Sequence, residues 1–290
     1  MANYLTTDTD LTAVANAIRT KGGTSAQLTF PQGFVDAIAA IQTGGGGDVD
    51  FFDYTWPSGS VSTQNTRIYL YALYYRSGVT AISAPNATNV GEYAFSECSA
   101  LTSANLPSAT SIPNSLFRGC RSLTDVTAPL ATSLSANGFM ACASLRTLAL
   151  PSLTSSSGQG VFDGATSLTV CVFGKHGVTS SVSTEFACTW NVFRGCSNIT
   201  ALDFGMKTTW NGTTQLPSGV DIVLRSTTIS TLSNASYIPT NSTIYVPSSM
   251  LSTYGSATNW SSVNGTSGRT IVAIEGSIYE TQYADGTSIT

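Results

Sequence analysis

Apolar positions recur along this chain with a period of 22 residues. Phe95, Phe117 and Phe139 are separated by this step, and each is followed by a cysteine three residues later and a leucine six residues later. Further copies at Phe162 and Phe193 follow after steps of 23 and 31 residues. The predicted repeat core consists of Phe95, Cys98, Leu101, Phe117, Cys120, Leu123, Phe139, Cys142, Leu145, Phe162, Leu168, Phe193 and Cys196.

A short run of alternating apolar and polar residues follows each copy. Examples are Ala104-x-Leu106-Pro107 and Leu148-x-Leu150-Pro151, and the same alternation returns around Ile222 and Ile244, so we count about eight such runs. A period of two puts one face of a strand into a core, and the proline ends the strand because it has no N–H to donate. One unit cannot bury its apolar face alone, so the pattern predicts that neighbouring units stack into a solenoid with a parallel sheet.

These units resemble the BspA-like leucine-rich repeats, in which L-x-x-(V/L)-x-(L/F)-P is followed by A-F-x-x-C. The resemblance covers residues 79 to 250. It departs from the family at Ala165, at the long insertion before Phe193, and in the last two turns, which lack the Phe-Cys half. It implies a repeat solenoid of short parallel strands in a surface or virion protein that binds other molecules.

Two amphipathic helices are predicted ahead of the repeats, each with apolar residues on one face, and the second ends at four consecutive glycines, 44–47. The predicted anchor and oligomer face consists of Leu11, Val14, Ile18, Phe34, Ile38 and Ile41. A hairpin of this size buries too little apolar surface to fold alone. Three or so copies could form a bundle, the hairpin could dock on another protein, or it could fold back on the solenoid.

Residues 4 to 41 also resemble an N-terminal module found in structural proteins of phages that infect Firmicutes. The resemblance implies a virion protein that is made in the host cytoplasm and released by lysis. The first residues show neither a basic segment nor an unbroken apolar run of the kind that directs secretion. An exported bacterial adhesin would ordinarily carry such a signal.

The predicted organisation has five parts. Residues 1–43 form a helical anchor, 44–48 a glycine-rich linker, 49–78 an aromatic β cap, 79–262 the leucine-rich-repeat solenoid with its C-terminal cap, and 263–290 a β tail. The aromatic segment has self-association as its alternative role. A short helix is expected to close the last turn after Met250, and Ile271 to Ile274 are expected to add one more strand.

Composition restricts the classes of partner. Charged residues make up 10% of the chain and the net charge is −4, without a cluster of lysine or arginine, which argues against binding to nucleic acid or to anionic membrane surfaces. No apolar stretch is long enough to insert into a bilayer. Four of the six cysteines occupy one repeat position, which predicts a buried column rather than disulfides or a metal site.

Candidate chemistry is sparse. The single histidine, His176, has no nucleophile motif around it, and no recognised metal or nucleotide motif occurs, so we expect no enzyme activity, cofactor or metal. The insertion from about 174 to 190 is the long departure from the period, and ligand-binding residues concentrate in such loops. The candidate ligand-binding loop residues are Lys175, His176, Glu185, Phe186 and Trp190. The alternative is an ordinary variable loop.

The strands should also present one row of side chains outward. The predicted outward residues are Ser83, Asn105, Thr127, Ala149, Val172, Asp203, Val223 and Tyr245, most of them small or polar in the first half. Together these features predict a non-enzymatic phage fibre protein, with a trimer favoured. Its hairpin would contact other virion proteins, and its solenoid would bind a host cell-surface protein or glycan. A BspA-like bacterial adhesin and a virion decoration protein without a receptor are the alternatives.

Overall fold

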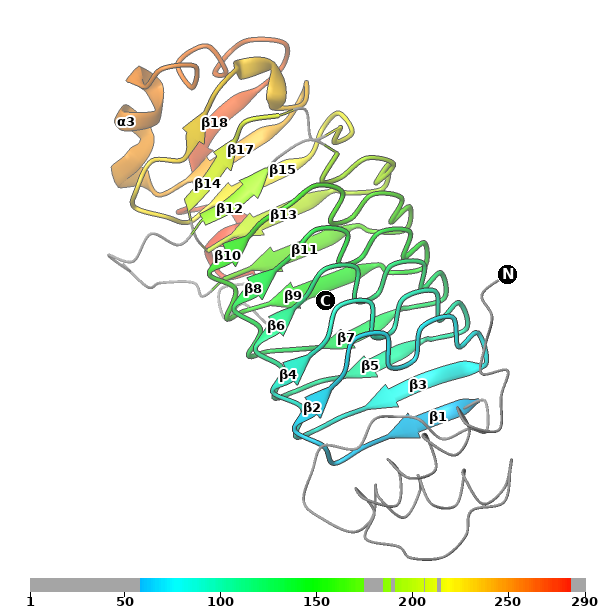
Figure 1. Ribbon diagram of the computed structural model, residues 1–290. Coiled ribbons are helices and arrows are strands. Elements are labelled where there is room, and N and C mark those ends of the chain that lie inside the picture. The colour runs from blue at the N-terminus through cyan, green and yellow to red at the C-terminus, as the bar shows by residue number, and fades with distance from the viewer. Residues whose placement is uncertain (1–57, 175–184, 189–190, 206, 213–214, 283–290) are drawn as a thin grey trace, which may run out of the picture. The chain divides into compact units, whose positions relative to one another are not determined.

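The computed structural model describes residues 58–174, 185–188, 191–205, 207–212 and 215–282 (Figure 1). These residues all belong to the second of two compact units, Pro57–Thr290. The predicted helical anchor, with its face of Leu11, Val14, Ile18, Phe34, Ile38 and Ile41, lies outside the described residues.

The second unit is a parallel β-solenoid of about eight repeat turns, as the period predicts (Figure 1). One side of each coil contributes a strand to row 1, in which neighbouring strands within a sheet pair in parallel. Row 1 contains β1 (Gly59–Ser62), β3 (Val79–Ser83), β5 (Ser103–Asn105), β7 (Asp125–Thr127), β9 (Thr147–Leu150), β11 (Val170–Phe173), β13 (Ala201–Phe204), β15 (Asp221–Leu224), β17 (Thr243–Val246) and β18 (Thr270–Ala273). The expected extra strand near Ile271 is therefore present as β18.

A second side of each coil contributes a strand to row 2, also parallel. These strands are β2 (Arg67–Ile68), β4 (Asn89–Val90), β6 (Ser111–Ile112), β8 (Ser133–Leu134), β10 (Ser155–Ser156), β12 (Glu185–Cys188), β14 (Lys207–Trp210) and β16 (Thr231–Leu232). The stacking begins at Gly59, where β1 pairs with β3, so residues placed in the aromatic cap by sequence already form a coil.

The third side of each coil is a run of turns that carries the Phe and Cys of the repeat. Every residue of the predicted repeat core is buried. The phenylalanine rings form one stack, with centroid distances of 5.7 Å from Phe95 to Phe117, 5.4 Å from Phe117 to Phe139, and 5.7 Å from Phe139 to Phe162. Phe162 and Phe193 are 5.3 Å apart although 31 residues separate them. The insertion therefore leaves the ring stack unbroken.

The cysteine column is held by hydrogen bonds between coils. The thiol of Cys120 donates to the carbonyl of Phe95 at 3.1 Å, and the thiol of Cys142 donates in the same way to Phe117. All six cysteines of the chain are buried and free. Burial raises the pKa of the Cys120 thiol well above its ordinary range, which keeps it protonated as the donor that this contact needs.

Left-handed backbone recurs twice in each coil on the third side. Tyr93, Ser115 and Asn137 occupy one such column, with φ of 55–56°, and the N–H of each donates to a carbonyl of the next coil. The conformation therefore helps to bind coils together along this side. For a residue other than glycine it costs roughly 1–2 kcal/mol.

Hydroxyl groups do much of the work that charges do on other surfaces. The hydroxyl of Thr102 donates to the carbonyl of Thr80 at 2.8 Å, and Thr124 donates to Thr102 at 3.0 Å. A second such ladder runs through Thr88, Thr110, Thr132 and Thr154 on another part of the coil. Exposed threonine thus stabilises the stacking of coils in a chain with few charged residues.

The last coil is closed by helical turns. After β17 come η2 (Ser248–Met250) and α3 (Leu251–Ser256), which is the short helix expected after Met250, while η1 (Ala235–Tyr237) lies between β16 and β17. Tyr254 and Trp260 are buried, with ring centroids 5.0 Å apart. The Trp260 indole N–H donates to the carbonyl of Ser230 at 2.7 Å, so this segment seals the apolar end of the coil stack.

Candidate binding surface

The outer face of row 1 is open along β3, β5 and β7. Its side chains are small, and they line up in register because Ser83 pairs with Asn105 and Asn105 with Thr127. Asn105, Asp125 and Thr127 are exposed. We call this surface the open face, formed by Ala81, Ser83, Ser103, Asn105, Asp125 and Thr127.

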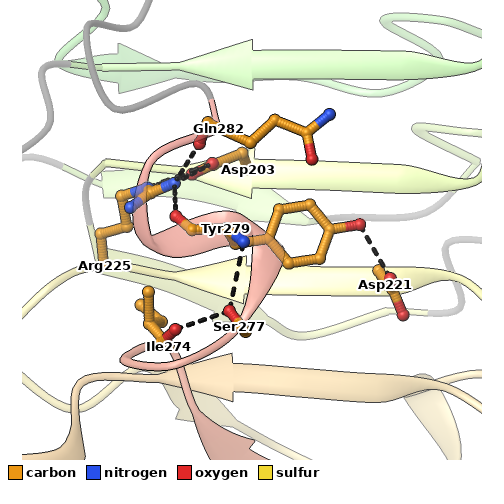
Figure 2. Close-up of polar contacts among 7 residues, drawn as sticks. All are labelled: Asp203, Asp221, Arg225, Ile274, Ser277, Tyr279 and Gln282. Atoms are coloured by element: carbon orange, nitrogen blue, oxygen red, sulfur yellow. Dashed lines mark hydrogen bonds and ion pairs between the residues drawn. The ribbon is translucent and has the colours of Figure 1, made fainter.

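The outer face of row 1 is covered along β11, β13 and β15. The prediction that Val172, Asp203 and Val223 face outward is correct for their register, but they are 0% exposed. The cover is the closing segment, residues 274–282, which follows β18 and turns back across the sheet (Figure 2). A continuous outward-facing ligand surface along the whole array is therefore wrong for this half.

Tyr279, in the helical turn η3 (Ile278–Glu280), fixes the closing segment to the sheet. Its ring packs edge-on against Tyr245 at 4.7 Å between centroids. Its phenol O–H donates to a carboxylate oxygen of Asp221 at 2.8 Å. Val172, Val223 and Ile274 complete the apolar cluster around it.

Arg225 provides the polar half of the attachment (Figure 2). Its Nη2 donates to the carbonyl of Tyr279 at 2.8 Å and to that of Gln282 at 2.9 Å. The same guanidinium pairs with Asp203, 2.7 Å from Nη2 to Oδ2, and the Asp203 side chain is fully buried. One arginine thus joins strand β13 to the backbone of the closing segment.

Burial dominates the electrostatics of this pair. Removal from water raises the pKa of Asp203 from 3.8 to about 6, and the hydrogen bonds and charge of Arg225 offset only part of that rise. A buried ion pair of this type costs desolvation energy and contributes little net stability. We interpret it as a fixed attachment for the closing segment, with no sign of a reactive group.

The insertion between β11 and β12 is only partly described. Lys175, His176 and Trp190 lie outside the described residues, and Glu185 begins β12. Phe186 is completely buried, with its ring 4.8 Å from Phe173 and 5.0 Å from Phe204. Its assignment to a ligand-binding loop is wrong because the strand turns this side chain into the core.

Within the described ranges, no group of three or more His, Cys, Asp or Glu residues could hold a metal ion. Asp163 and Arg194 form an ion pair on the third side, as do Glu97 and Arg118. These pairs join neighbouring coils. Among the same residues, no helix has the length and apolarity needed to cross a bilayer.

The repeat pattern, its buried Phe-Cys column and the parallel coils agree with one known family. A family model described as "BspA type Leucine rich repeat region" matches residues 66–189 in six copies. This region is a BspA-type leucine-rich repeat array. A comparison with curated proteins gave no match.

Several solved structures share BspA-type features with this array at low identity. The pneumococcal vaccine antigen PcpA is 13% identical, with a TM-score of 0.38; the match covers 74% of this chain and 41% of PcpA. A leucine-rich cell surface protein from Faecalibacterium prausnitzii A2-165 is 14% identical, with a TM-score of 0.31 and coverage of 80% and 83%. A leucine-rich repeat protein from Bacteroides ovatus is 14% identical, with a TM-score of 0.27 and coverage of 75% and 84%. This chain therefore spans less than half of the pneumococcal protein.

Sequence reasoning missed the closing segment. Its contacts join residues 54 to 58 positions apart, and the tail carries no repeat pattern. A signal was present in the strands beneath it, because Val170 to Phe173 and Ile222 to Leu224 are nearly continuous apolar runs. Such runs are typical of strands that are buried on both faces.

Proposed function

We propose that this chain is a binding scaffold, and specifically a fibre-type virion protein that attaches to a host cell surface through the solenoid. The observation that carries the proposal is the contrast along row 1. The closing segment covers β11 to β15, whereas Asn105, Asp125 and Thr127 remain exposed. A leucine-rich repeat array is typically a non-enzymatic binding scaffold, and the open face is its one broad uncovered strand surface among the described residues.

The virion assignment rests on residues 4 to 41, which resemble a structural module of Firmicutes phages. In this proposal residues 1–43 contact other virion proteins and hold a homo-oligomer, with a trimer favoured. The ligand is a host cell-surface protein or glycan, and the protein is made in the host cytoplasm and released by lysis. Light scattering on the full chain would give the oligomer mass.

A BspA-like bacterial adhesin is the second candidate, and the family match favours it equally because that family includes cell-surface proteins. Immunogold labelling distinguishes the two. Antibodies against the solenoid should label purified phage particles under the first proposal and the bacterial envelope under the second.

The open face itself is tested with two charged substitutions. Asn105 and Thr127 are neighbours in the sheet register, so Asn105→Arg with Thr127→Arg places two long cations in the centre of the open face. We expect binding of the full chain to a panel of Firmicutes cells to fall at least tenfold while the melting temperature stays unchanged. Leu130→Arg is the matched control, because Leu130 is 52% exposed away from these strands. Equal binding by the double variant would refute the role of the open face.

A further inference from the structure

Four tyrosines gather on the third side of the first two coils. We call Tyr71, Tyr74, Tyr75 and Tyr93 the tyrosine cluster. The ring of Tyr71 stacks on Tyr93 at 5.0 Å, and packs edge-on against Tyr74 at 5.2 Å. Tyr74 in turn meets Tyr75 at 4.5 Å. The rings therefore form one continuous aromatic surface.

The tyrosine cluster faces away from the core. Tyr71 is 47% exposed and Tyr75 is 59% exposed, and the neighbouring Leu70 is 54% exposed. Ala72 and Leu73, in the same turn, fill the interior instead. The aromatic rings thus add little to the burial of the first coil.

The backbone at these positions does not favour tyrosine. Tyr71, Tyr75 and Tyr93 have φ of 60°, 60° and 56°, in the left-handed region that suits glycine and asparagine. At equivalent positions, later coils carry Ser115, Asn137, Gly119 and Gly164. Strained residues that point outward are concentrated at functional sites. Three bulky rings held in this conformation and left exposed indicate selection for an external contact.

We propose that the tyrosine cluster is a saccharide-binding site, separate from the open face, so that the proposed attachment function has a second contact surface. The size of the cluster favours this ligand. With Leu70 it exposes on the order of 400 Å², which is about half of what one partner buries in a stable protein–protein interface. One to three sugar rings, whose C–H faces stack on aromatic rings, match an area of this size.

Charge and hydrogen bonding support the same ligand class. Arg118 and Glu97 beside the cluster neutralise one another at 3.5 Å, and Arg67 lies over the ring of Tyr69. Nucleic acid bound by stacking needs a positively charged groove along the strand, which this surface does not offer. The Asn114 amide donates to the phenol oxygen of Tyr93 at 3.4 Å, which leaves the phenol O–H to donate to a neutral hydroxylated ligand.

The test uses the full chain on an array of immobilised bacterial cell-wall oligosaccharides built from N-acetylglucosamine, glucose, galactose and rhamnose. Wild-type protein should bind at least one of them, and Tyr71→Asn and Tyr75→Asn should each weaken that binding at least tenfold. Asparagine tolerates the left-handed backbone, so the melting temperature of both variants should be equal to or above that of the wild type. A loss of binding can then not be attributed to unfolding.

Ser115→Asn is the matched control, because Ser115 occupies the same backbone column without an aromatic ring. It should leave saccharide binding unchanged. A blank array for the wild type, or equal binding by Tyr71→Asn, overturns the proposal. It is also overturned if Tyr71→Asn lowers the mass in light scattering while no saccharide binds, because the cluster is then a contact between copies. Cell binding that survives both tyrosine variants leaves the attachment function standing without this site.

Discussion

Replacement of Tyr279 by alanine should release the closing segment and leave the coils intact. Tyr279 is only 4% exposed, and truncation of a buried aromatic side chain costs roughly 3–5 kcal/mol. That figure includes the edge contact with Tyr245 and the hydrogen bond to Asp221, each worth about 1 kcal/mol. Fixing each residue of the segment costs about 1–2 kcal/mol of conformational entropy, so the contacts of Arg225 alone should not hold it in place.

The effect should be local, because β11 to β17 remain paired when the segment leaves. A loss of about 3 kcal/mol corresponds to a roughly 100-fold change in an opening equilibrium. We therefore expect the amides of Glu280 and Gln282, which donate to Ser277 and Ile278, to exchange with solvent deuterium about 100-fold faster in Tyr279→Ala. The amide of Phe117, deep in the coil stack, should exchange at the wild-type rate.

Ile278→Ala provides the control for this measurement. Ile278 lies in the same helical turn but is 66% exposed, so its truncation should change the exchange of Glu280 and Gln282 by less than about threefold. Equal protection of these amides in Tyr279→Ala and wild type would refute the reasoning. So would an equal acceleration in both variants, because the tyrosine contacts would then not be what holds the segment.

Three further predictions concern the core. Phe139→Ala should lower the free energy of unfolding in urea by roughly 3–5 kcal/mol, since its ring stacks on both neighbours; a loss below about 1 kcal/mol would contradict the stack. All six cysteines should resist a thiol reagent such as DTNB until the protein unfolds, because they are buried; fast labelling of folded protein would contradict this. The folded state holds the pKa of Asp203 at about 6, above its ordinary 3.8, so the stability that this group contributes is complete below about pH 4 and is lost as pH rises through 6. Asp203→Asn should therefore gain stability relative to wild type between pH 4 and 7 in urea titrations, and a pH-independent difference would refute the assignment.

The period of the sequence predicts the coils because burial in a solenoid depends only on neighbouring units. Phe95, Phe117 and Phe139 can shield one another only if each coil has the same length, so their spacing alone determines the stack. The outward register of Asn105 and Thr127 follows from the same alternation. These features are local to one repeat and its neighbours, and a single sequence contains them.

The features that sequence did not predict depend on distant or unusual contacts. The pairing of Arg225 with the carbonyls of Tyr279 and Gln282 spans more than two coils and follows no period. Left-handed backbone at Tyr71 and Tyr75 is equally hidden, because tyrosine ordinarily indicates extended structure. The assignment of Phe186 to a loop failed because the core resumes at that residue, only one position after β12 begins at Glu185.

The spacing of the phenylalanine rings shows where this architecture tolerates a change in length. Between Phe162 and Phe193 the chain gains nine residues over the 22-residue step, yet the rings are 5.3 Å apart, as close as any others in the stack. The additional residues do not alter the pitch of the array. A corner of the coil that accepts extra chain at no cost to the stack is a place where new recognition loops can be gained, exchanged or engineered while the scaffold beneath them stays the same.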